Sequence, residues 1–153
     1  GRQVVDDMIS AFEFADNDVY RAVTHNKGVM NGTISVANAT GQDSRAIEAA
    51  AHAYASHTGK YRSLTKWEKD NSGNLVGIFE IPLSVGIVGG VTNDHPIAKI
   101  CTKILKLQNV QELACIMAAT GLAQNFAAMR ALVTEGIQKG HMKLHARKQA
   151  SNS

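Results

Sequence analysis

Apolar residues recur every three to four positions along much of the chain, the spacing that places side chains on one face of a helix. The alanine-rich run that starts at Ser44 predicts a helix, because alanine has the highest helix propensity, and Gly59 would end it. Pro96 stands where another helix can begin. Gly121 lies between two later stripes and predicts either a bend or two helices. The predicted helical stripes cover residues 3–15, 97–105, 113–117 and 122–133.

A hairpin gives the clearest β signal. Arg62–Lys69 and Asn74–Ile81 are rich in strand-forming residues and are joined by the turn sequence D-N-S-G. Residues 82–92 continue as strand or loop with glycine breaks. Residues 17–40 contain several Gly and Asn, which favour turns, so we expect short helical turns and loop there. The fold class predicted is α+β, mainly helical with one β-hairpin, in a single unit.

Composition places the chain among globular, water-soluble proteins. It has 153 residues, 44% hydrophobic and 19% charged, which is enough to bury one core. No apolar run approaches the roughly 20 residues that cross a bilayer, so we expect no membrane contact. Cys101 and Cys115 form no C-x-x-C pair, and we expect both to be buried, reduced thiols in a cytoplasmic protein.

Positive charge gathers near the end of the chain. Residues 139–148 hold four Lys or Arg, with His141 and His145, and no acid. Such a segment is typical of a solvated helix end, of a contact with an anionic cofactor, or of a non-catalytic binding module for nucleic acid or an acidic partner. It lacks interleaved aromatic residues, which disfavours nucleic acid. The two histidines have the spacing of a metal pair but no third ligand nearby, so we expect no metal.

Three side chains could carry chemistry, and each has a simpler alternative. Lys27 stands in H-N-K-G, and it is either a surface lysine or part of a polar pocket. Asp43 directly precedes the helix predicted from Ser44, where aspartate is a preferred N-cap. His141 could transfer a proton at neutral pH, since imidazole has a pKa near 6.5, or could simply end a helix at the surface.

The segment Arg21–Asp43, with the patterns H-N-K-G and A-T-G-x-D, closely resembles the catalytic segment of class II (bacterial-type) 3-hydroxy-3-methylglutaryl-coenzyme A (HMG-CoA) reductases. Residues 131–144, which include G-H-M, fit the histidine signature of the same family. The resemblance extends from about Val4 to Ala150. It implies that residues 1–138 are the later part of the large substrate-binding domain and that residues 139–153 begin a truncated C-terminal flap.

This resemblance implies an NAD(P)H-dependent oxidoreductase of isoprenoid metabolism that interconverts HMG-CoA and mevalonate, with coenzyme A, by two hydride transfers. It also implies a homodimer. Lys27 would stabilise the oxyanion and Asp43 would tune the lysine. His141 would protonate the coenzyme A thiolate, and Arg21 and Asn31 would hold the acyl portion of the substrate.

Asn125 also matches a family residue near the site, but a polar helix position explains it equally well. The family glutamate in E-x-P-S and the nicotinamide-domain pattern D-A-M-G-x-N are absent from the sequence. The glycine run Val85–Thr92 lacks phosphate-loop spacing. We therefore expect NADH or NADPH to bind mainly outside this chain, and the chain alone to be inactive without the remainder of the parent. We also expect exposed core surface, because partner elements are missing.

Overall fold

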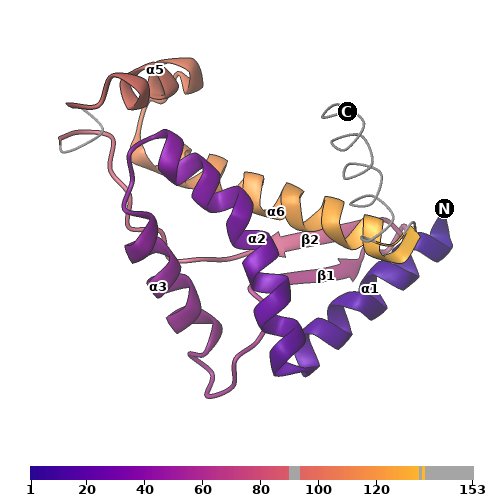
Figure 1. Ribbon diagram of the computed structural model, residues 1–153. Helices are drawn as coiled ribbons and strands as arrows, with labels where there is room; N and C mark the ends of the chain where they lie inside the picture. The colour runs from indigo at the N-terminus through magenta and orange to yellow at the C-terminus, as the bar shows by residue number, and fades with distance from the viewer. Residues whose placement is uncertain (90–93, 135, 137–153) are drawn as a thin grey trace, which may run out of the picture.

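The computed structural model describes residues 1–89, 94–134 and 136. Within them, α6 (Val110–Thr134) packs against α2 (Val19–Ala39) along the most extensive helix contact, and the hairpin of β1 and β2 lies beside them (Figure 1). Helices α1 and α5 lie toward opposite ends of α6. The remaining elements are α1 (Arg2–Asn17), α3 (Ser44–Ala55), β1 (Thr65–Lys69), β2 (Leu75–Phe79) and α5 (Pro96–Leu105). The predicted fold class, mainly helical with one hairpin, is confirmed.

The local elements follow the sequence pattern closely. Helix α1 begins one residue before the prediction and ends two residues after it. The hairpin is antiparallel, pairs Thr65 with Phe79 and Lys69 with Leu75, and turns at Gly73, whose φ is +81°. Gly59 also has a positive φ of +88° just beyond α3. Residues 80–89 form neither helix nor strand, so the loop alternative holds there.

Residues 19–39 form one continuous helix, and the expectation of short turns and loop is wrong. Asp18 begins it by accepting a hydrogen bond from the Arg21 N–H at 2.8 Å. The glycine at position 32 serves packing rather than a turn. A Cβ atom there would lie 2.6 Å from the Thr120 carbonyl oxygen and 3.0 Å from the Gly121 Cα. Gly121 sits inside the single helix α6, so neither a bend nor a second helix is needed to explain it.

Two hydrophobic clusters share α6. The first joins α2, α3 and α6 through buried residues that include Met30, Ile47 and Met117. The second joins α1, β1 and α6 through Met8, Trp67 and Met129. Each cluster takes at least one buried side chain from α6, so this helix is the element that both cores have in common.

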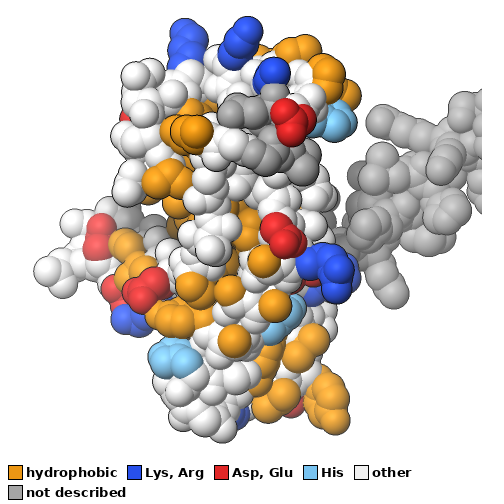
Figure 2. Space-filling view, turned by 90° about the vertical axis from the view of Figure 1, so that its left-hand side faces the viewer, with side chains coloured by type: hydrophobic (Ala, Val, Ile, Leu, Met, Phe, Trp, Pro, Cys, Tyr) orange, Lys and Arg blue, Asp and Glu red, His pale blue; other side chains and the backbone are white. Residues whose placement is uncertain are grey.

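Helix α5 leaves much of its apolar face uncovered. Ile97, Ile100 and Ile104 are 61%, 56% and 71% exposed, and among its residues only Ala98 is buried. Figure 2 shows hydrophobic side chains beside basic ones (Lys or Arg) at the upper end of the molecule, where α5 lies. This part of the chain therefore exposes apolar surface, and the expectation that missing partner elements would cover it stays a prediction. Cys101 is half-buried and Cys115 is exposed, so the expectation of two buried thiols is wrong for Cys115.

Candidate functional site

The predicted site residues on α2 lie on its solvent side. Lys27 and Asn31 are both exposed and are four residues apart, so they are neighbours on one helix face. Arg21 is half-buried, with its guanidinium carbon 5.9 Å from the centre of the Phe14 ring. In the part of the chain that the structure describes, the Lys27 ammonium has no hydrogen-bond or ion-pair partner. As far as the described residues go, this face presents an unpaired cation beside an amide.

The buried side of α2 includes the polar residues His25 and Asn26, which directly precede Lys27. Asn26 is fully buried; its Nδ2 donates to the Arg62 carbonyl and its Oδ1 accepts from the Leu64 N–H, both at 2.8 Å. The His25 Nε2 lies 2.7 Å from the Thr65 hydroxyl oxygen. Both residues thus bind the segment that enters β1.

Asn125 is part of the same buried network. It is 2% exposed, and its Oδ1 accepts hydrogen bonds from the Thr65 hydroxyl at 3.1 Å and from the Trp67 indole N–H at 2.8 Å. Its described partners are internal, in agreement with a structural role on α6. A contact of Asn125 with substrate stays a prediction.

Asp43 caps α3. Its Oδ1 accepts from the Ala46 N–H at 3.0 Å, and the side chain is otherwise exposed. The capping role predicted from sequence is confirmed, and the catalytic role stays a prediction. Among the residues with described positions, no hydrogen bond or ion pair joins Asp43 to Lys27. His141 lies outside the described residues, as do His145 and the basic segment 139–148.

Burial shifts the acidity of His25. Desolvation, and next the positive charge of Arg21, lower the pKa of His25 from 6.5 to about 4, against a smaller opposing effect of Asp16. The imidazole is therefore neutral at pH 7. The roles of His25 and Asn26 were missed by sequence reasoning. Had residues 19–39 been placed on a helix, both would have fallen on the side of buried Ala22 and Val29, where polar residues need partners.

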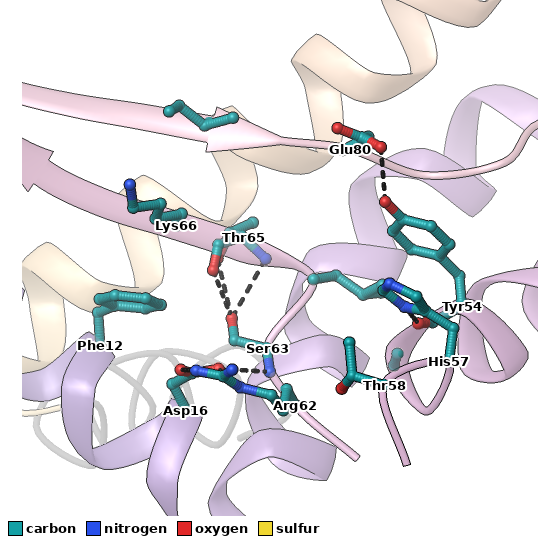
Figure 3. Close-up of a pocket in the computed structure, with 13 residues that line it drawn as sticks. Phe12, Asp16, Tyr54, His57, Thr58, Arg62, Ser63, Thr65, Lys66 and Glu80 are labelled. Atoms are coloured by element: carbon teal, nitrogen blue, oxygen red, sulfur yellow. Dashed lines mark hydrogen bonds and ion pairs between the residues drawn. The ribbon is translucent and has the colours of Figure 1, made fainter. Parts of the chain in front are cut away.

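A cavity of about 460 Å³ opens between the end of α1, the end of α3 and the hairpin (Figure 3). The Arg62 Nε donates to the Asp16 Oδ1 at 3.2 Å, and the Tyr54 hydroxyl donates to the Glu80 Oε1 at 2.5 Å. These pairs join elements across the cavity wall. Of the predicted site residues that the structure describes, none lines this cavity. The cavity and the Lys27 face are separate features.

Neither a metal cluster nor a membrane helix is found in residues 1–89, 94–134 and 136. No three His, Cys, Asp or Glu side chains converge there, and no helix combines the length and hydropathy needed to cross a bilayer. The His141 and His145 pair lies beyond these residues, so the expectation about metal stays a prediction.

Three comparisons relate the chain to known proteins. The family model described as hydroxymethylglutaryl-coenzyme A reductase matches residues 1–146. A 3-hydroxy-3-methylglutaryl-coenzyme A reductase of Archaeoglobus fulgidus is 56% identical over 147 residues, which make up 96% of this chain and 34% of that protein. A probable 3-hydroxy-3-methylglutaryl-coenzyme A reductase of Borreliella burgdorferi is 47% identical over 143 residues, 93% of this chain and 32% of that protein.

The fold agrees with that of a solved structure from the same family. A structure of the class II 3-hydroxy-3-methylglutaryl-CoA reductase from Streptococcus pneumoniae, bound to NADPH in open conformations, superposes with a TM-score of 0.85 at 45% identity. The superposition covers 96% of this chain and 36% of that one. The chain thus spans about a third of the length of the relatives it matches. The resemblance seen in the sequence is confirmed.

Proposed function

Since the chain belongs to the hydroxymethylglutaryl-coenzyme A reductase family, we propose that the longer protein of which it forms part interconverts HMG-CoA and mevalonate, with coenzyme A and NADH or NADPH. The observation that carries this proposal is the match of residues 1–146 to the family, within which the H-N-K-G and A-T-G-x-D patterns stand intact. The 153 residues alone are proposed to be inactive, because they span about a third of the relatives' length.

The exposed face of α2 would meet the reacting end of the substrate. Negative charge develops on the thioester oxygen during reduction, and the Lys27 ammonium would stabilise it by a few kcal/mol. Arg21 and Asn31 would hold the acyl portion, since a guanidinium binds carboxylate in a bidentate fork. His141 would deliver a proton to the coenzyme A thiolate, and Asp43 would act together with Lys27, as the family resemblance implies. The solvent-facing position of Lys27, which has no partner among the described residues, supports this assignment.

The described residues do not fit a nicotinamide coenzyme by themselves. The glycine run Val85–Thr92 lacks the spacing of a phosphate-binding loop, and its residues 90–92 lie outside the described range. The coenzyme, which supplies the hydrides, is therefore assigned to the remainder of the longer protein. The S. pneumoniae relative binds NADPH, which supports the class of coenzyme. A cytoplasmic homodimer without metal or nucleic acid is proposed on the family resemblance.

The alternative function, a binding module for nucleic acid or an acidic partner, depends on residues 139–148, which lie outside the described range. No contact among the described residues favours it. The family match and the intact catalytic patterns favour the reductase.

The test measures HMG-CoA-dependent oxidation of NADH and of NADPH by the full-length protein. Lys27→Ala and His141→Ala are each expected to reduce kcat by orders of magnitude with the fold retained. A wild-type protein that is inactive with both NADH and NADPH would overturn the reductase assignment. If both variants keep full activity, the family assignment stands, but the roles proposed for Lys27 and His141 are wrong.

Asp43 needs a matched pair of variants, because it caps α3 as well. Asparagine is as good an N-cap as aspartate, whereas alanine removes the cap at a cost of about 1 kcal/mol. Asp43→Asn is therefore expected to keep wild-type stability and lose activity, while Asp43→Ala loses both. An active, stable Asp43→Asn variant would show that the carboxylate acts only as a cap.

A further inference from the structure

Two residues before Lys27 link α2 to its neighbours. Asn26 does so through backbone groups, and His25 through a side chain. Asn26 uses both ends of its amide, one toward the Arg62 carbonyl and the other toward the Leu64 N–H. These are main-chain groups, so no change of rotamer on the partner side can follow a movement of the helix. A rotation or sliding of α2 would break both bonds at once.

The second link is a chain of hydrogen bonds whose direction follows from its members. The Trp67 indole nitrogen can only donate, so the Asn125 atom that it meets at 2.8 Å must be the amide oxygen. The Thr65 hydroxyl donates to the same oxygen at 3.1 Å. A hydroxyl has one proton, so the oxygen of Thr65 must accept from the His25 Nε2, which lies 2.7 Å away.

The Ser63 hydroxyl is a further neighbour of Thr65. It donates to the Thr65 carbonyl at 2.8 Å, so it can only accept from the Thr65 hydroxyl, whose oxygen is 3.3 Å away, compared with 3.1 Å for the Asn125 Oδ1. With the Thr65 proton on the shorter bond to Asn125, the Thr65 oxygen accepts from a His25 ring that is protonated on Nε2. Burial and the neighbouring Arg21 keep the ring neutral at pH 7, while Asp16 acts weakly in the opposite direction. The chain of donors runs from α2 through β1 to α6 and spans 100 positions of sequence between its helical ends, residues 25 and 125.

We propose that His25 and Asn26 are positioning residues: the Nε2–H donor of His25 and the amide of Asn26 set the rotation and height of α2, and so hold the Lys27 ammonium at its place. The proposal rests on the proposed catalytic role of Lys27. Its physical basis is that Lys27 is exposed and free of described partners, so its location is decided by the backbone from which it extends. A displacement of about 1 Å can reduce a rate by about a hundredfold.

The kinetic test compares two variants at position 25 in the full-length enzyme. Glutamine places a donor near the position of Nε2, whereas leucine fills the space without one. His25→Leu is expected to lower kcat by about tenfold to a hundredfold, with the KM for HMG-CoA within about threefold of wild type. His25→Gln is expected to recover about tenfold of that loss. Equal kcat values for the two variants would overturn the proposal.

A double-mutant cycle separates positioning of Lys27 from a general effect on folding. In a Lys27→Ala background, His25→Leu is expected to change kcat by less than about twofold, because the group that it positions is gone. An undiminished additional loss would show that His25 acts by another route, and would overturn the proposal.

A spectroscopic measurement keeps the inference testable even if the enzyme is inactive. Nitrogen-15 NMR of selectively labelled histidine, assigned with His25→Gln, is expected to show a neutral ring protonated on Nε2 at pH 7. A ring protonated on Nδ1 would overturn the hydrogen-bond chain itself. Wild type inactive with HMG-CoA, together with the expected NMR signal, would overturn the reductase function and the link to Lys27 but not the tautomer.

Discussion

Alanine at position 32 tests whether the close approach of α2 and α6 sets the place of the candidate site. A Cβ atom there would meet the Thr120 carbonyl oxygen at 2.6 Å and the Gly121 Cα at 3.0 Å. Both are backbone atoms, so a helix must move to relieve the overlap. Gly28 is one turn earlier on the same helix and has no atom within 4 Å of an added Cβ. It is therefore a matched control.

The magnitude follows from two opposing terms. Replacing a helical glycine with alanine gains about 1 kcal/mol of helix propensity, and at Gly28 nothing opposes that gain. At Gly32 the same gain meets an overpacking cost of about 1–3 kcal/mol, and the upper end applies because backbone faces backbone. Gly32→Ala is therefore expected to be about 3 kcal/mol less stable than Gly28→Ala and about 2 kcal/mol less stable than wild type. For a domain of this size, a loss of about 2 kcal/mol lowers Tm by about 4–8 °C.

The assay is thermal unfolding of the longer protein, followed by far-ultraviolet circular dichroism at equal concentrations. Gly28→Ala is expected to melt at or above the wild-type temperature, and Gly32→Ala clearly below it. If the two variants melt together, the contact between α2 and α6 does not require glycine, and the explanation given for the continuous helix is wrong.

Three further predictions concern single side chains. The pKa of His25 is about 4 in the folded chain and about 6.5 in the unfolded chain, so the unfolded state gains its proton first as the pH falls. The free energy of unfolding should drop by about 2 kcal/mol between pH 7 and pH 5, as measured by urea unfolding. If His25→Gln shows the same dependence of unfolding free energy on pH, the prediction is wrong. Trp67→Phe removes a donor to buried Asn125 and should cost about 1–2 kcal/mol, visible as a lower urea midpoint; an unchanged midpoint would show that the bond is not needed. Arg62→Met breaks an exposed ion pair with Asp16 and should cost less than about 1 kcal/mol. Because salt screens such a pair, a cost that persists in high salt would point to packing instead.

Local signals in the sequence are sufficient for most elements of the fold. The D-N-S-G turn predicts the hairpin because Gly73 can adopt the positive φ that the turn needs, and Asp43 predicts the start of α3 because its carboxylate caps a free N–H. Residues 19–39 are different. Their glycine and asparagine content opposes a helix by intrinsic propensity, and contacts with α6, some 90 positions away in sequence, reverse that preference.

The residues of the candidate site also differ in whether the local sequence identifies them. Lys27 and Asp43 are identified by motifs that are contiguous in sequence, so their place in the chain could be predicted. The partners of His25 and Asn26 could not, because Thr65 and Leu64 lie about forty positions away and nothing in the local pattern names them. Polar residues on the buried side of a helix indicate that partners exist without indicating which ones they are.

The shared helix α6 has a consequence for how the chain folds during synthesis. Both hydrophobic clusters draw buried side chains from α6, Met117 in one and Met129 in the other. A ribosome delivers α1, α2, α3 and the hairpin before α6, and both clusters stay incomplete until α6 has emerged. Until then the apolar faces that these two clusters bury lack their α6 partner, and chaperones bind such exposed surfaces.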